Sequence, residues 1–221
     1  MADNITASED NTENEKGSAL LAARTECNLV KVLTLSLGAL ITLIVLTWAI
    51  ELWLKIGFQW FDEQAMATCL GLTLAIIFIR YPFGGGRDRP SLPWYDVILA
   101  IVGLVTCLYL AYIYGDIELN PFEMRPTMFV IGVILIPMVW ESLRRTTGWS
   151  LTLVFSVFMA YVFVGHLMPG MLEGREQKFM PAIAELGVTN VAIMGLPTKI
   201  IVLTVVLFIW MGQLLLHTGA S

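Results

Sequence analysis

Apolar and charged positions form alternating blocks along this chain. Long uncharged runs are separated by short segments that hold most of the Asp, Glu, Lys and Arg residues. A membrane-spanning helix needs about 20 mostly apolar residues, within a range of about 17 to 25. The runs therefore predict an all-α integral membrane protein with about six transmembrane helices, over residues 32–50, 64–80, 97–115, 126–143, 147–168 and 199–217.

The residues before the first run differ in character. Residues 1–29 are polar, and Asp3, Glu9, Asp10, Glu13 and Glu15 all precede the first lysine. A signal peptide would instead begin with a basic segment and continue into an apolar core. We expect a disordered cytoplasmic tail over 1–29 and a membrane domain over 30–221.

Composition supports the membrane class. Hydrophobic residues make up 57% of the chain and charged residues 14%, whereas soluble domains usually carry about 25% charged residues. So few charges could not cover a surface exposed to water, and we expect no enzyme activity. The net charge of -5 gives no indication of nucleic-acid binding.

Lysine and arginine in short loops predict the orientation of the helices, because basic loops stay in the cytoplasm. Loop 80–96 holds three arginines, and Arg144 and Arg145 follow the fourth run, whereas loops 51–63 and 116–125 are acidic. Both termini are then expected to be cytoplasmic. The external segments are expected to be 51–63, 116–125 and 169–199.

Cysteine, histidine and glycine give little evidence of chemistry. Cys27, Cys69 and Cys107 form no C-x-x-C pair and are interpreted as apolar packing residues. His166 and His217 are predicted at opposite membrane faces, roughly 25–30 Å apart, so one haem could not use both. The run 84–86 is interpreted as a flexible connector, because no Gly-Lys-Ser/Thr follows it.

The charged residues within the predicted spans, Arg80, Glu141 and Lys199, lie at or near a span end, and no span is expected to bury a charge. Transporters usually build ion and solute sites from discontinuous helices with polar groups at mid-membrane. We therefore expect no catalytic, substrate-binding or metal-binding residue on this chain, and no cofactor. The chain has the character of a scaffold.

Small residues recur at four-residue spacing on the second predicted helix. Ala67, Gly71 and Ala75 would share one face, which suits close packing of a neighbouring helix.

The densest charge cluster follows the fourth run. Glu141 is three and four residues before Arg144 and Arg145, so all three share one face of a helix. One interpretation is a local ion pair that anchors the helix end. Alternatives are a contact to a partner protein or lipid, and a role in proton relay.

The segment around this cluster resembles the fused permeases of the tripartite ATP-independent periplasmic (TRAP) transporters, in the subfamily whose binding protein is called TAXI. Those permeases carry a Glu-x-x-Arg-Arg-x-x-Gly-Trp segment, here Glu141, Arg144, Arg145, Gly148 and Trp149. Weaker similarities extend over residues 64–221. Unlike the fused proteins, this sequence stops at Ser221, before the hairpins that bind ion and solute.

The resemblance implies the small membrane subunit of such a transporter, in the bacterial inner membrane. Its expected partners are the large membrane subunit, a periplasmic TAXI-type binding protein and membrane lipids. The complex would import organic acids such as dicarboxylates by symport, and coupling to sodium or protons would occur on the large subunit. The expected docking residues for the binding protein are Asp116, Glu118, Glu123, Arg125, Glu173 and Arg175.

Two other classes stay open. One is the small membrane subunit of another tripartite importer, such as the tricarboxylate type. The other is a membrane anchor subunit of a redox complex.

Overall fold

The computed structural model describes residues 28, 30–52, 55, 57, 60–81, 83, 93–119, 126–167, 178–189 and 192–219. Within these ranges every regular element is a helix and no strand occurs, which confirms the all-α fold class. The tail predicted over 1–29 lies almost wholly outside the described residues, as do Cys27 and the glycine run 84–86.

The first spanning helix is Val30–Ala49. The elements that follow are α3 (Asp62–Arg80), α4 (Trp94–Leu119), α5 (Pro126–Thr147), α6 (Trp149–Val164), the 3₁₀ turn η1 (Gly165–Leu167), α7 (Phe179–Val188), α8 (Leu196–Ile200), the π-helical turn η3 (Ile201–Val205) and α9 (Val206–Thr218).

Among the described residues, five helices are long and apolar enough to cross a membrane, one fewer than the sequence predicted. The exception is the run 147–168. Its α-helix, α6, has only 16 residues because Gly148 precedes it and a 3₁₀ turn follows at Gly165. At a rise of 1.5 Å per residue α6 is about 24 Å long, shorter than a hydrocarbon core of about 30 Å.

Local chemistry explains the bounds of α3. Asp62 and Glu63 lie in its first turn and Arg80 in its last, where they complement the helix dipole. The Gln64 side chain accepts a hydrogen bond from the Phe61 amide at 3.1 Å, which satisfies one of the free donors at the helix start.

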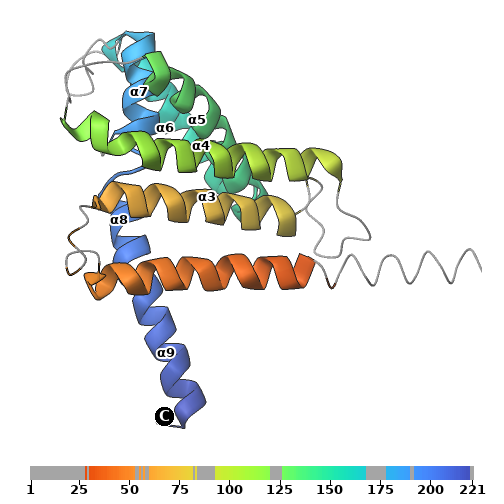
Figure 1. Ribbon diagram of the computed structural model, residues 1–221. Coiled ribbons are helices and arrows are strands. Elements are labelled where there is room, and N and C mark those ends of the chain that lie inside the picture. Colours follow the sequence, from red (N-terminus) through yellow and green to blue (C-terminus); the bar gives the residue numbers. More distant parts are fainter. Residues whose placement is uncertain are drawn as a thin grey trace, which may run out of the picture.

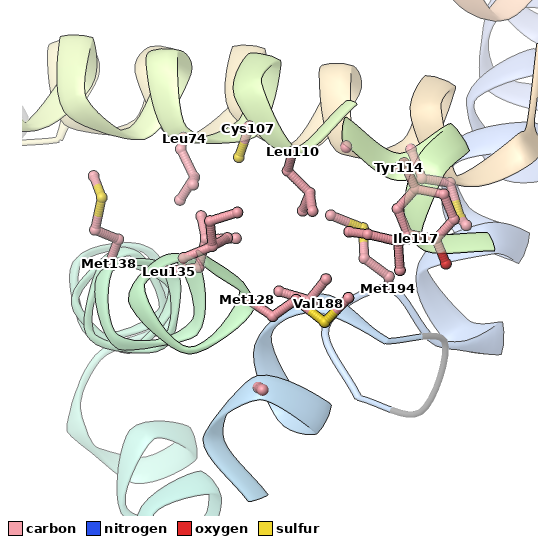
Figure 2. Close-up of a cluster of buried hydrophobic side chains, with 14 of the residues drawn as sticks. Leu74, Cys107, Leu110, Tyr114, Ile117, Met128, Leu135, Met138, Val188 and Met194 are labelled. Carbon is pink, nitrogen blue, oxygen red and sulfur yellow. The ribbon is translucent and has the colours of Figure 1, made fainter. Parts of the chain in front are cut away.

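The helix Val30–Ala49, α3 and α4 lie side by side in Figure 1, and α5, α6 and α7 lie beyond α4. Among the elements α3 to α9, the most extensive contact is that of α3 with α4. Figure 2 shows the core between this layer and the α5–α7 side: Leu74, Cys107 and Leu110 approach Leu135 and Met138 of α5. The core thus joins one layer of helices to a second set that crosses it.

Small residues set the distance between α3 and α4. A Cβ at Gly71 would lie 2.7 Å from the Cβ of Cys107, so only glycine allows the observed approach. Ala67 and Ala75, on the same face of α3, are buried. Cys69 and Cys107 are buried, free cysteines, and Cys107 fills this contact next to Gly71 as a small apolar residue.

The segment predicted to be external over 169–199 contains a packed helix. Residues Ala182, Ile183, Ala184, Gly187 and Val188 of α7 are buried. A Cβ at Gly187 would lie 2.4 Å from the Cα of Gly132, and a Cβ at Gly132 would lie 2.5 Å from the Ile183 carbonyl oxygen. The backbones of α5 and α7 therefore touch where they cross.

The C-terminal helical segment Leu196–Thr218 differs from the preceding helices in its burial. It is 23 residues long, and none of its residues is buried. In Figure 1 α9 runs away from the other helices, across the direction shared by α3 and α4. This helix thus contributes almost nothing to the core of the chain.

Replacing Gly132 by Ala is expected to lower the free energy of unfolding by about 1–3 kcal/mol, since the new methyl group would overlap the α7 backbone. Gly38→Ala is the matched control, because nothing lies within 4 Å of a Cβ at this second helical glycine. Thermal unfolding in mild detergent measures both. Equal stability of the two variants would contradict the close crossing of α5 and α7.

Candidate functional site

A buried ion pair joins the first turn of α4 to the last turn of α5. Arg145 Nη1 lies 2.7 Å from Asp96 Oδ1, and the two side chains are 2% and 0% exposed. Removing a lone charge from water costs several kcal/mol, so each of these groups depends on the other for its burial. The pair therefore links two helices that are separate in sequence.

Glu141 extends the pair into a cluster of four charges. It accepts hydrogen bonds from Arg144 Nε and Nη2, both at 2.8 Å, and from Arg145 Nε at 2.7 Å. This is the contact that the three- and four-residue spacing predicts. The two carboxylates and two guanidiniums together carry no net charge.

Three helix ends meet at this cluster. Arg145 Nη1 also donates to the carbonyl oxygen of Tyr81 at 3.2 Å, just after the end of α3. An arginine near the carboxyl ends of α3 and α5 is favoured by the helix dipole, as is Asp96 near the amino end of α4. The cluster thus satisfies charges and backbone groups of α3, α4 and α5 at once.

Aromatic rings cover the guanidinium groups. The Cζ of Arg144 lies 4.4 Å from the centre of the Phe83 ring, and that of Arg145 lies 5.0 Å from the Phe78 ring. Such contacts are worth about 0.5–2 kcal/mol each. They also keep water away from the ion pairs, which strengthens the attraction between the charges.

Gly148 and Trp149 form the corner between α5 and α6, next to the charge cluster. Gly148 has φ 83° and ψ -172°, a conformation that is essentially restricted to glycine, and it separates α5 from α6. The Trp149 ring meets Trp140 edge-on at 6.3 Å, and Trp140 Nε1 donates to Ser156 Oγ at 2.9 Å. All five residues of the Glu-to-Trp segment therefore build one corner between α5 and α6.

Asp96 is the member of this cluster that the sequence did not reveal. The third run was bounded at Asp96, whereas α4 begins at Trp94 and buries this carboxylate completely. The expectation of spanning helices without buried charges is therefore wrong at this end of α4. In the sequence Asp96 only precedes the third predicted span, and this position does not specify a partner.

The cluster is suited to a structural role. Both carboxylates and both guanidiniums are bound within the protein, so none presents its full charge to a solute. Among the described residues, no three His, Cys, Asp or Glu side chains are placed to hold a metal ion. His166 lies exposed in η1, and His217 Nδ1 lies 2.8 Å from the Gln213 carbonyl oxygen in α9.

Weaker polar contacts occur at the end of α3 and α4 that is opposite the charge cluster. Lys199 of α8 forms an ion pair with Asp62 of α3, with side chains 44% and 34% exposed. Gln64 Nε2 donates to the Ala111 carbonyl oxygen of α4 at 2.9 Å. The first contact is the polar link between the C-terminal helix and the layer, and its exposure makes it weak.

Only two of the six residues predicted to dock the binding protein lie among the described residues. Asp116 and Glu118 lie in the last turn of α4 and are exposed, so they belong to a helix rather than to the predicted loop. Glu123, Arg125, Glu173 and Arg175 lie outside the described residues.

No protein-family model, curated protein or solved structure matches this chain. The helices define a multi-pass, all-α membrane protein.

Arg145→Ala is expected to lower the free energy of unfolding by about 3–5 kcal/mol, because Asp96 would be left buried without its partner. Asp96→Ala should have an effect of the same order, and the double variant should lose less than the sum of the two. The control is Lys199→Ala, which breaks an exposed pair and should cost about 0–1 kcal/mol. Additive losses at 96 and 145 would show that the two residues do not interact.

Gly148→Ala is expected to cost about 1–3 kcal/mol through backbone strain alone, since nothing lies within 4 Å of its Cβ position. Gly212→Ala is the control: the space around it is equally open, but its helical backbone favours alanine by up to about 1 kcal/mol. Unfolding of the two variants in detergent makes the comparison. A tolerated alanine at 148 would be evidence against the strained corner.

Proposed function

We propose that this chain is the small, static membrane subunit of a TAXI-type TRAP transporter in a bacterial inner membrane. The large membrane subunit would carry the organic acid and the coupling sodium ion or proton. A periplasmic TAXI-type binding protein would deliver the solute. The resemblance of the Glu141–Trp149 segment suggests the family, and the burial pattern and charge cluster of the helices support the role of a static subunit.

The observation that carries the proposal is the C-terminal helix. Leu196–Thr218 is long enough to span a bilayer but buries no residue against the rest of the chain. Spanning helices associate by close van der Waals packing, whereas this helix only partly buries Val202 against the core and forms an exposed ion pair with α3. A second membrane protein that packs along it, the large subunit, accounts for this surface.

The charge cluster suits a static subunit. The network that joins α3, α4 and α5 has no second arrangement readily available, because separating α4 from α5 would leave Asp96 buried without its partner. Moving α3 would also break the hydrogen bond from Arg145 to the Tyr81 carbonyl oxygen. Such a corner would resist motion while a partner domain moves beside it.

The length of α4 supports contact with both sides of the membrane. Asp116 follows Asp96 by 20 residues in one helix, a rise of about 30 Å, which matches the thickness of the hydrocarbon core. Asp116 and Glu118 would then lie at the periplasmic face. They are the docking residues proposed for the binding protein within the described part of the chain.

The direct test is purification of the tagged full chain from its native membrane in mild detergent, with co-purifying proteins identified by mass spectrometry. We expect one large multi-span permease in equal amount. Isolation of the chain with redox subunits, or without any partner, would contradict the proposal. So would uptake of an organic acid by liposomes that contain this chain alone.

Gly212→Leu is expected to reduce recovery of the large subunit at least about tenfold, because a glycine in open space on α9 offers a place for a partner helix to approach closely. The control is Gln213→Leu, which adds a leucine to the adjacent face of the same helix. Equal recovery with both variants would exclude close packing of the large subunit at Gly212.

A further inference from the structure

An apolar groove lies between the first helix, α3 and α4. It has a volume of 380 Å³ and is lined only by apolar side chains, among them Leu33, Leu37, Ala75, Ile79, Ala100 and Ile101. This volume is within the range of about 300–1,000 Å³ that is usual for ligand sites. The groove is separate from the charge cluster and from α9.

The groove is short and lies toward one end of the helices. Its lining residues run from 30 to 37 on the first helix and from 97 to 104 on α4, about 10 Å along each axis. Half of the hydrocarbon core is about 15 Å thick, so the groove fits within one leaflet.

Basic and aromatic residues lie at the end of the groove. Lys31 and Arg80 directly follow the lining residues Val30 and Ile79, and both are exposed. Within the described part of the chain, neither forms an ion pair. Trp94, which is 75% exposed, lies one turn before the lining residue Val97. Tryptophan at a helix end is typical of the headgroup level, so this end of the groove is placed among headgroups.

We propose that this groove is a binding site for one anionic phospholipid, with an acyl chain along the groove and its headgroup phosphate near Lys31 and Arg80. The nearby charge cluster is neutral, so among the described residues these two cations give this end of the groove its positive charge. Each basic residue close to an anionic headgroup favours its binding by about 1 kcal/mol. The apolar lining would accept the chain of any lipid, and the charges would select the anionic one.

A lipid fits this groove better than a second transmembrane helix does. A helix that crosses the membrane would follow a seam of about 30 Å, whereas the lining residues cover about a third of that length. Branched side chains such as Leu33, Ile79 and Ile101 also form much of the lining, whereas helix contacts in membranes favour small residues.

Native mass spectrometry of the full chain in mixed micelles tests the site, with palmitoyl-oleoyl phosphatidylglycerol and the matching phosphatidylcholine as probes. We expect the wild-type chain to retain one phosphatidylglycerol in preference to phosphatidylcholine. The double variant Lys31→Gln, Arg80→Gln should reduce this preference roughly tenfold or more. The matched control is Lys55→Gln, Lys178→Gln, which removes two exposed lysines away from the groove.

A second pair of variants tests the groove itself. Ile101→Trp should fill it and abolish retention of both lipids, because this half-exposed residue lines it. Ile98→Trp adds the same ring on α4 outside the described lining and should leave retention unchanged.

Three results would overturn the proposal: equal retention of the two lipids by the wild type, retention unaffected by Ile101→Trp, or an unaltered preference after loss of Lys31 and Arg80. If Ile101→Trp instead displaced a co-purifying membrane protein and left lipid retention intact, the groove would hold a partner helix. The proposal is independent of the transporter assignment, because the lipid measurement needs no other subunit.

Discussion

The ion pair between Asp96 and Arg145 is the contact on which the arrangement of this chain depends. It is buried where α3 and α5 end and α4 begins, and a charge in that position is tolerated only while its partner is present. Glu141 holds both arginines from within α5, and aromatic rings exclude water from the group. The positions of three helices are therefore fixed by electrostatics at one end.

The remaining packing depends on close backbone approach rather than on charge. Gly71 lets α3 lie against α4, and Gly132 with Gly187 lets α7 cross α5. In an apolar solvent there is little hydrophobic gain from bringing helices together, so contact area between backbones becomes decisive. The chain thus has a tightly packed centre, in contrast to α6 and the C-terminal helix, which bury almost nothing.

This contrast between a packed centre and exposed outer helices supports the proposed role. A centre with all its cluster charges engaged is suited to support, and outer helices with free apolar faces are suited to contact with lipid or another membrane protein. The proposed lipid groove lies on the first-helix side of the layer, whereas the proposed subunit contact is on α9. The lipid groove and the subunit contact on α9 would then both hold the packed centre of the chain in the membrane.

The sequence by itself determined the helical class, the approximate spans and the contact of Glu141 with Arg144 and Arg145, because runs of apolar residues and three- and four-residue spacing are local properties. It also placed the small residues of α3 on one face. It predicted one spanning helix over 147–168, whereas in the structure the α-helix α6 follows Gly148 and gives way to a 3₁₀ turn at Gly165. Only the tertiary structure decided the partner of Asp96, the crossing of α5 over α7 and the isolation of α9. Each of these depends on segments far apart in the chain, and no local pattern specifies which distant residue will satisfy a buried charge or meet a glycine.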